Sequence, residues 1–348
     1  MLLKKLVKAK YSKKETTTLR SFKSKFHIYT GEQLHWLQVV FKLKFSVFQP
    51  ILPWVLLCFG YSCLISLLHH FGFFTFIELS KVLPQVILSL NIVLSLLLAF
   101  RTNSAHDRFW EGRKLWGSLV NTVRNLTRGI WIEVNEYEPR DRTKKERTLR
   151  QVVAFTVAMK LHLRREPVNH ELSLLISELQ YSKLTKVNHP PLEIAFWIGD
   201  FLQHQYELKN LNIFQMNSLQ ELLDDLVDIL GGCERILKTP MPLIYTMILK
   251  MLLIIYFLLL PVEMVGGLHL WTGPIVGFIS LVLLGIDEIG AEIEEPFGHD
   301  PNDLPLDLIC STMHRNVEDL ITCKRQHHSH KLRLFDNYNN QNIEDLIS

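Results

Sequence analysis

The sequence predicts an all-α membrane protein with four transmembrane helices and a large helical cytosolic region. The chain is 48% hydrophobic and yet 21% charged, so strongly apolar segments must alternate with strongly polar ones. Four apolar runs of 19 to 24 residues carry almost no charge, and each can cross about 30 Å of hydrocarbon as a helix. No segment stands out for the alternation of apolar and polar residues that is typical of strands.

The predicted spans lie at residues 45–68, 82–100, 240–262 and 264–286. The prolines of the first span fall near its start, where a helix tolerates them. Lys250 is the one charge in the third span. Short loops are expected near 69–81 and near 261–267. A soluble protein would have to bury the first and third spans as core helices, which uncharged runs of this length disfavour.

The distribution of charge predicts the orientation of the chain. Residues 1–44 hold eleven lysines and arginines against two glutamates, and residues 101–150 hold twelve, whereas the loops between spans hold few. By the positive-inside rule, both termini and the middle region are cytoplasmic and the chain is a multi-pass protein of the cell membrane. The predicted parts are a basic segment (1–44), spans one and two (45–100), a cytosolic helical region (101–239), spans three and four (240–286), and an acidic segment with a tail (287–348).

The middle region is predicted to be helical because its apolar residues recur at three-and-four spacing. Asn217 or Ser218 with Glu221 fits a capping box, and Gly231-Gly232 fits a stop or bend. The sequence contains no P-loop, G-x-G-x-x-G, H-E-x-x-H or G-x-S-x-G motif. The five cysteines form no C-x-x-C pair, and we interpret them as reduced thiols. We therefore expect no enzyme activity, no required cofactor and no nucleic-acid partner.

The second span carries an apolar stripe at Ile92, Leu96 and Phe100, which share one face of a helix at i, i+4 and i+8. On a lone helix this stripe would face lipid. In a ring of identical helices the same stripe would form stacked apolar collars, and a narrow apolar neck can gate a pore by shedding its water. Spacing alone does not choose between these two arrangements.

A polar and cationic block follows this span directly, and the chain ends in an acidic segment. The block is predicted to line a vestibule, chiefly as charges that pair with one another; its members are Arg101, Asn103, Asp107, Arg108, Trp110, Glu111 and Arg113. The acidic segment offers weak metal candidates at Glu292, Glu295, Asp300 and Asp303. A metal-dependent membrane enzyme built on the acids at 287–295 is one alternative, and a membrane-anchored scaffold or signalling protein is another.

Three blocks of sequence resemble the bestrophin family in its bacterial branch. They are FRTNSAHDRFWEGRKLWGSLVNTVRNLTR, GGCERILKTPMPLIYT and DEIGAEIEEPFGHDPNDLPLD, in the same order across about residues 30–310. The Arg-x-x-Trp-type element corresponds to Asp107–Trp110 here, and the Glu-x-Pro-Phe-Gly element to Glu294–Gly298.

This resemblance implies a homopentamer in a bacterial inner membrane, with an ion pore on its fivefold axis. Ile92, Leu96 and Phe100 then correspond to the family's hydrophobic neck, and Ile213 or Phe214 to a second, cytosolic aperture. The pore would conduct small ions passively, and we expect these to be chloride or other anions. A sodium-type monovalent-cation channel of the same fold is the alternative. Animal members bind calcium through a run of acids after Pro-Phe-Gly. That run is short here, so we do not expect calcium gating.

Overall fold

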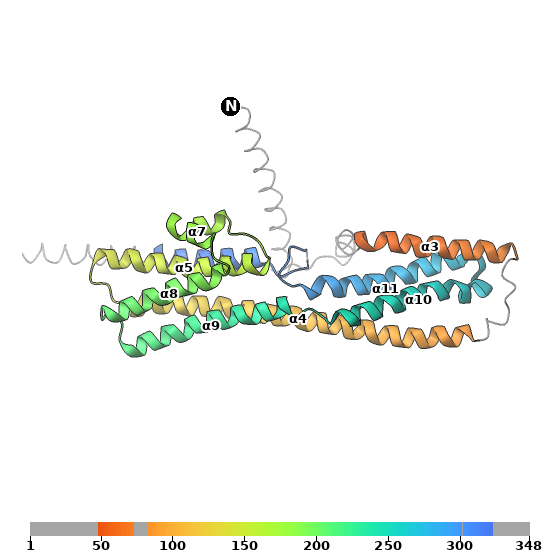
Figure 1. Ribbon diagram of the computed structural model, residues 1–348, viewed down its shortest axis with the longest axis horizontal. Helices are drawn as coiled ribbons and strands as arrows, with labels where there is room; N and C mark the ends of the chain where they lie inside the picture. The colour runs from red at the N-terminus through yellow and green to blue at the C-terminus, as the bar shows by residue number, and fades with distance from the viewer. Residues whose placement is uncertain (1–47, 73–81, 301, 323–348) are drawn as a thin grey trace, which may run out of the picture. The chain divides into compact units, whose positions relative to one another are not determined.

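The computed structural model describes residues 48–72, 82–300 and 302–322 (Figure 1). Helices and short connections account for these residues, and no strand occurs among them. The all-α prediction is therefore confirmed. The predicted basic segment 1–44, most of the first predicted loop and the tail beyond residue 322 lie outside the described residues. The chain divides into two compact units, residues up to 113 with 235–304, and residues 114–234 with those from 305 onward.

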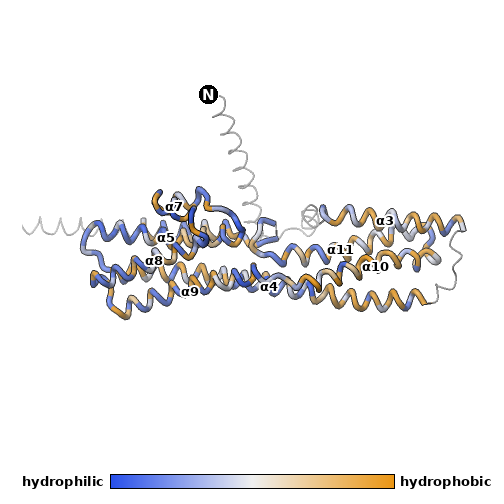
Figure 2. The backbone as a smooth tube through the Cα atoms, viewed as in Figure 1, coloured by the Kyte–Doolittle hydropathy of each residue, from blue (hydrophilic) through white to orange (hydrophobic). Residues whose placement is uncertain are grey.

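The first unit holds the apolar helices. They are α3 (Phe48–His70), the first part of α4 (Leu83–Glu133), α10 (Leu243–Leu268), the short helix η2 (His269–Trp271) and α11 (Thr272–Glu294). Figure 2 shows α3, α10 and α11 mostly in the colour of hydrophobic residues. By length and composition, three described stretches are apolar enough to cross a membrane: Gln49–His70, Leu83–Glu133, and Ile213–Glu294, which includes both α10 and α11. The count of four spans stays a prediction.

Two of these helices approach closely because α11 carries glycines where α3 crosses it. A Cβ built on Gly273 would lie 2.5 Å from Sγ of Cys63, and one on Gly277 would lie 3.2 Å from the ring of Phe59. Small residues four apart let two apolar helices approach closely. In lipid, helices are held together by dispersion contacts at short range rather than by the exclusion of water. Ser66 adds a hydrogen bond from its hydroxyl to the carbonyl of His269 at 2.7 Å.

The loop expected near 261–267 is wrong. These residues are instead the last part of α10, which includes Pro261, and the chain turns at η2. The second predicted span, 82–100, lies almost wholly within α4, which continues as a helix through the charged block to Glu133. Neither the proline nor the change from apolar to polar residues interrupts these helices.

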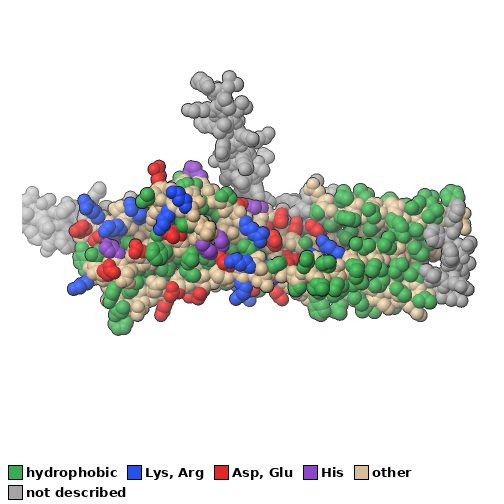
Figure 3. All heavy atoms as spheres, in the orientation of Figure 1, with side chains coloured by type: hydrophobic (Ala, Val, Ile, Leu, Met, Phe, Trp, Pro, Cys, Tyr) green, Lys and Arg blue, Asp and Glu red, His purple; other side chains and the backbone are tan. Residues whose placement is uncertain are grey.

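The second unit is a bundle of amphipathic helices. It comprises the rest of α4, α5 (Pro139–Leu163), α6 (His170–Ser173), α7 (Glu178–Leu184), α8 (Pro190–Glu207), most of α9 (Ile213–Lys238) and a helix at 306–322. Its core combines fully buried apolar residues of α4, α5, α8 and α9, among them Leu126, Phe155, Ile198 and Leu219. Figure 3 shows Lys, Arg, Asp, Glu and His side chains gathered over the helices of this unit, whereas hydrophobic side chains cover the visible face of α3 and α10.

An ion-pair cluster fixes α5 inside this bundle. Lys160, with 2% of its side chain exposed, lies 2.5 Å from a carboxylate oxygen of Glu171 and 2.9 Å from one of Asp307. Arg164 also donates to Asp307 at 3.1 Å. Burial raises the pKa of Asp307, but the attraction of Lys160 and Arg164 outweighs it, so this pKa lies below its ordinary value.

The cysteines of the described part of the chain are all free thiols, as predicted: Cys58, Cys63, Cys233 and Cys310. Burial raises the pKa of Cys310 to about 12, which keeps it a neutral thiol. Cys323 lies outside the described residues.

Candidate functional site

The predicted neck residues lie on an exposed face of α4. The exposed fractions of Ile92, Leu96 and Phe100 are 64%, 54% and 54%. Leu88, one turn earlier, extends the same stripe and is 62% exposed. In the single chain, this face of α4 therefore presents a strip of large apolar side chains that no other described helix covers.

The opposite face of α4 is buried in the core of the first unit. Leu94 and Leu98 are 1% and 4% exposed, and they pack against apolar residues of α10 and α11, including Leu253 and Val276. The hydroxyl of Tyr245 on α10 donates to the carbonyl of Leu97 at 2.6 Å. These contacts fix the rotation of α4, so the stripe at 92, 96 and 100 cannot turn inward. Exposure alone fits a face toward lipid or toward an axis in an assembly, and the neck stays a prediction.

Arg101, the first residue after the stripe, is a buried ion-pair partner. Its guanidinium pairs with the carboxylate of Asp287 on α11, and the two side chains are 4% and 11% exposed. A buried charge needs such a partner, because its removal from water is otherwise very costly. The pair ties α4 to α11 at the point where the apolar run ends.

Arg108 holds the end of α9 and the end of α11 to α4. Its guanidinium donates to the carbonyls of Ile236 at 2.7 Å, of Thr239, and of Glu294 at 3.2 Å. The last carbonyls of a helix lack partners within it, so an arginine that donates to them caps the helix. The carboxylate of Glu294 in turn accepts from the backbone N–H of Met241 at 2.8 Å.

The remaining members of the predicted vestibule cluster differ in their surroundings. Glu111 pairs with Arg235 at 2.5 Å, and the two side chains are 46% and 70% exposed. Asp107 is 86% exposed on its side chain, Trp110 is 51% exposed, Asn103 is exposed and Arg113 is half-buried. The structure thus joins three of the seven, Arg101, Arg108 and Glu111, to residues of the segments 235–241 and 287–294, and leaves Asn103 and Asp107 at the surface.

The Pro-Phe-Gly element forms a tight loop after α11. Phe297 is 2% exposed and lies against Gly112 of α4, where a Cβ would meet its ring at 3.2 Å. The carboxylate of Asp303 accepts from the backbone N–H of Asp300 at 2.6 Å, and that of Glu292 accepts from the amide of Asn302 at 2.6 Å. The candidate metal acids Glu292, Glu295, Asp300 and Asp303 do not form a cluster of metal-ligating side chains in the described part of the chain.

The predicted cytosolic aperture residues begin α9 in the second unit. Ile213 and Phe214 are 46% and 82% exposed. Asn212 and Gln215 cap this helix reciprocally, each accepting from the other's backbone N–H through its side-chain oxygen, at 2.9 and 3.0 Å. The cap predicted at Asn217 or Ser218 is therefore wrong, since both lie inside α9.

One cluster of potential metal-ligating side chains was not predicted from the sequence. His162, His189 and Glu234 bring their ligating atoms within 4.8 Å of one another in the second unit. His162 and Glu234 are 72 residues apart, so no short motif could have revealed them. Of the three residues, only Glu234 lies in a sequence block singled out above, and that block resembles the bestrophin family without indicating a metal site.

Comparison with known proteins places this architecture. The sequence profile described as "Bacterial/Fungal Bestrophin protein" matches residues 27–319. A "Voltage-dependent anion channel-forming protein" of Nostoc sp. is 54% identical over 304 residues, covering 87% of this chain and 97% of that protein. One of the same description from Synechocystis sp. is 47% identical over 286 residues, covering 82% and 92%. A crystal structure of a mutated bacterial Bestrophin homolog from Klebsiella pneumoniae superimposes with a TM-score of 0.69 at 28% identity, covering 79% of this chain and 100% of that one.

Proposed function

The chain belongs to the bacterial and fungal bestrophin family, and we propose that it forms a homopentameric channel that conducts small anions, chloride among them, passively across the bacterial inner membrane. The observation that carries the proposal is the exposed stripe at Ile92, Leu96 and Phe100. It lies on a helix whose other face is buried and whose rotation is fixed. The description of the relatives as anion channel-forming proteins supports the ion class.

Five copies of α4 around an axis would turn the stripe into stacked apolar rings. A narrow ring of Ile, Leu and Phe offers an ion no hydrogen bonds, so an ion crosses it only by losing part of its hydration. The neck would then conduct or close according to its width. Small changes in the packing of α4 against α10 and α11 would control that width.

The vestibule cluster would act mainly as a structural frame that holds the helices together. The charge of Arg101 is neutralised by Asp287, and the donors of Arg108 are spent on carbonyls. Asn103, one turn below the stripe, is exposed, as is Ser104. Their amide and hydroxyl groups can donate to an anion that leaves the neck. Passage would thus need neither a metal nor a catalytic group, in keeping with a channel that requires no cofactor.

Four membrane crossings with both termini in the cytoplasm complete the proposal. The apolar helices α3, α10, α11 and the first part of α4 supply the crossings. The twelve basic residues of 101–150 and the basic N-terminal segment favour the cytoplasmic side by the positive-inside rule.

The ion class is tested by the reversal potential of the purified protein in planar bilayers under a tenfold KCl gradient. An anion-selective pore reverses near the chloride equilibrium potential, about 59 mV in magnitude. A reversal of opposite sign would identify the monovalent-cation channel instead, and silent bilayers would favour a membrane-anchored scaffold. The stoichiometry is tested separately by native mass in detergent, where five 40.7-kDa subunits are expected.

A further inference from the structure

Two histidines and a glutamate from three different elements converge in the second unit. Nε2 of His162 on α5 lies 2.8 Å from Oε1 of Glu234 on α9, and Nε2 of His189, the residue before α8, lies 2.7 Å from the same oxygen. The two imidazole rings are 4.4 Å apart between centroids and tilted by 37°. Both ring nitrogens therefore point at one carboxylate.

The chemistry of these three groups selects a class of ion. Imidazole nitrogen and carboxylate oxygen are ligands of zinc and similar divalent transition metals, and two histidines with one glutamate leave a fourth tetrahedral position open. Calcium and magnesium prefer oxygen ligands throughout. We propose that His162, His189 and Glu234 bind a zinc-class divalent metal ion that joins α5, α8 and α9.

The geometry needs only a small change to accept the ion. Zinc lies about 2.0–2.1 Å from such ligands, which places tetrahedral ligand atoms about 3.3 Å apart. The two nitrogen-to-oxygen separations of 2.8 and 2.7 Å must therefore widen by about half an ångström. The ligating atoms already lie within 4.8 Å of one another, so no backbone element has to move far.

The surroundings hold the ligands in place without sealing them. The side chains of His162, His189 and Glu234 are 23%, 34% and 16% exposed. His189 immediately precedes Pro190 and Pro191, which fix the backbone at the start of α8. The site is thus partly buried and built on helices rather than on a mobile tail.

One hydrogen bond must be given up on binding. Nδ1 of His189 accepts from the backbone N–H of Leu192 at 3.3 Å, which makes Nε2 the protonated nitrogen of a neutral ring. A metal on Nε2 moves the proton to Nδ1 and breaks this long bond. Leu192 is exposed, so water can take over its N–H.

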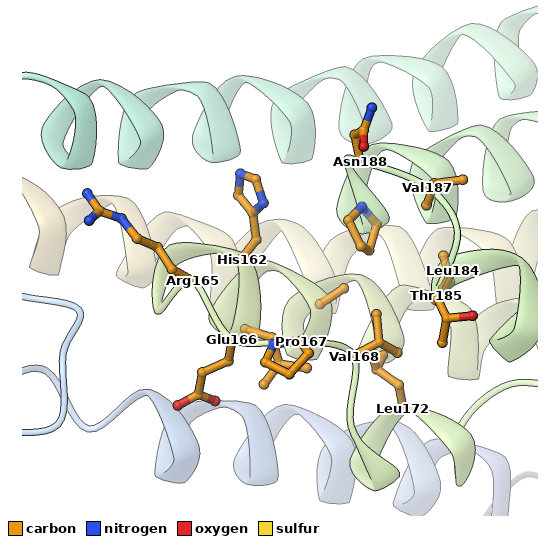
Figure 4. Close-up of a pocket in the computed structure, with 13 residues that line it drawn as sticks. His162, Arg165, Glu166, Pro167, Val168, Leu172, Leu184, Thr185, Val187 and Asn188 are labelled. Carbon is orange, nitrogen blue, oxygen red and sulfur yellow. The ribbon is translucent and has the colours of Figure 1, made fainter.

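A cavity lies beside the cluster, and of the three proposed ligands His162 alone lines it. It has a volume of about 290 Å³ and reaches His162, with Arg165, Glu166 and Asn188 also in its lining (Figure 4). Arg165 and Glu166 carry opposite charges, so the pair does not give the cavity a net positive charge. A water molecule fits the open position that three protein ligands leave.

The test measures zinc in the full chain, purified without a polyhistidine tag, stripped with a chelator and dialysed against zinc. Bound metal is counted by mass spectrometry in the wild type, in Glu234→Gln and His189→Gln, and in the matched control His204→Gln, whose histidine is exposed on α8. We expect Glu234→Gln and His189→Gln to hold one zinc per subunit fewer than the wild type and the control. Equal zinc in all four proteins would overturn the proposal, since any ions found would then lie elsewhere, the histidines at 327–330 included.

Two readouts do not depend on the variants folding. Zinc at 100 times its Kd should raise the melting temperature of the wild type by about 4 °C. The X-ray absorption spectrum of its tightest-bound zinc should show two imidazole ligands at about 2.0–2.1 Å. A melting temperature that zinc leaves unchanged, or a spectrum without two imidazoles, would leave the cluster as a hydrogen-bonded triad that ties three helices together without a metal.

Discussion

The buried pair of Arg101 and Asp287 gives a sharp prediction about what the charged block does. Replacing Arg101 with methionine keeps much of the side-chain volume but removes the charge. Asp287, whose side chain is 11% exposed, then loses the ion pair that compensates its burial between helices. If the charged block holds the helices together, this variant must unfold more easily than the wild type. If Arg101 instead contacts passing ions, the variant must change the ion selectivity of the channel.

The expected size follows from the burial of the pair. Removing one partner of a buried ion pair typically costs about 3–5 kcal/mol, because the other charge stays desolvated without compensation. Replacing both partners with apolar residues of similar volume is often neutral. The double variant Arg101→Met with Asp287→Leu should therefore recover most of what Arg101→Met loses.

The assay is unfolding of the purified protein in detergent, followed by tryptophan fluorescence. Asp107→Asn serves as the control, since that side chain is 86% exposed and its change should stay within about 0.5 kcal/mol. The reasoning fails if Arg101→Met costs less than about 1 kcal/mol, or if the double variant is as unstable as the single one.

Two further predictions concern packing and pH. Gly273→Ala places a Cβ 2.5 Å from Sγ of Cys63, so overpacking of about 1–3 kcal/mol should outweigh the gain of about 1 kcal/mol in helix propensity. Gly266→Ala, which meets nothing within 4 Å, should be neutral or stabilising in the same thermal assay; equal effects would contradict the close approach of α3 and α11. The depressed pKa of Asp307 contributes stability that is complete above the unfolded-state pKa of about 3.9 and is lost as pH falls through the lower folded-state value. Below about pH 4, the free energy of unfolding should therefore fall more steeply with pH in the wild type than in Asp307→Asn. Identical pH profiles would show that the cluster of Asp307 with Lys160 does not contribute to acid unfolding.

The sequence was sufficient for the fold class because the relevant signals are local. Runs of 19 to 24 apolar residues and three-and-four spacing are properties of single segments, and the helices they predicted are present. Helix ends were harder. Residues 101–111 contain neither glycine nor proline, so nothing in them stops α4 when the surroundings turn polar. Pro261 likewise lies inside α10, where its missing N–H did not end the helix.

The site was only partly accessible to the same reasoning. A periodic stripe such as that at Ile92, Leu96 and Phe100 can be found from spacing, but its exposure depends on which face α10 and α11 cover. The partner of Arg101 lies 186 residues away, and the cluster of His162, His189 and Glu234 spans 72 residues. Such contacts follow from tertiary packing, and a single sequence carries no local signal for them.

The single-channel conductance of the variant with Ile92, Leu96 and Phe100 all changed to alanine tests the central claim most directly. The matched control changes three exposed apolar residues of α10, Ile244, Met251 and Ile254, to alanine. If the stripe forms the neck of a ring of α4 helices, the first variant conducts more than the wild type, since the dewetting barrier falls with the apolar side chains, while the control conducts as the wild type does. Unchanged conductance in the first variant, or an equal rise in both, would contradict the neck and leave the stripe facing lipid.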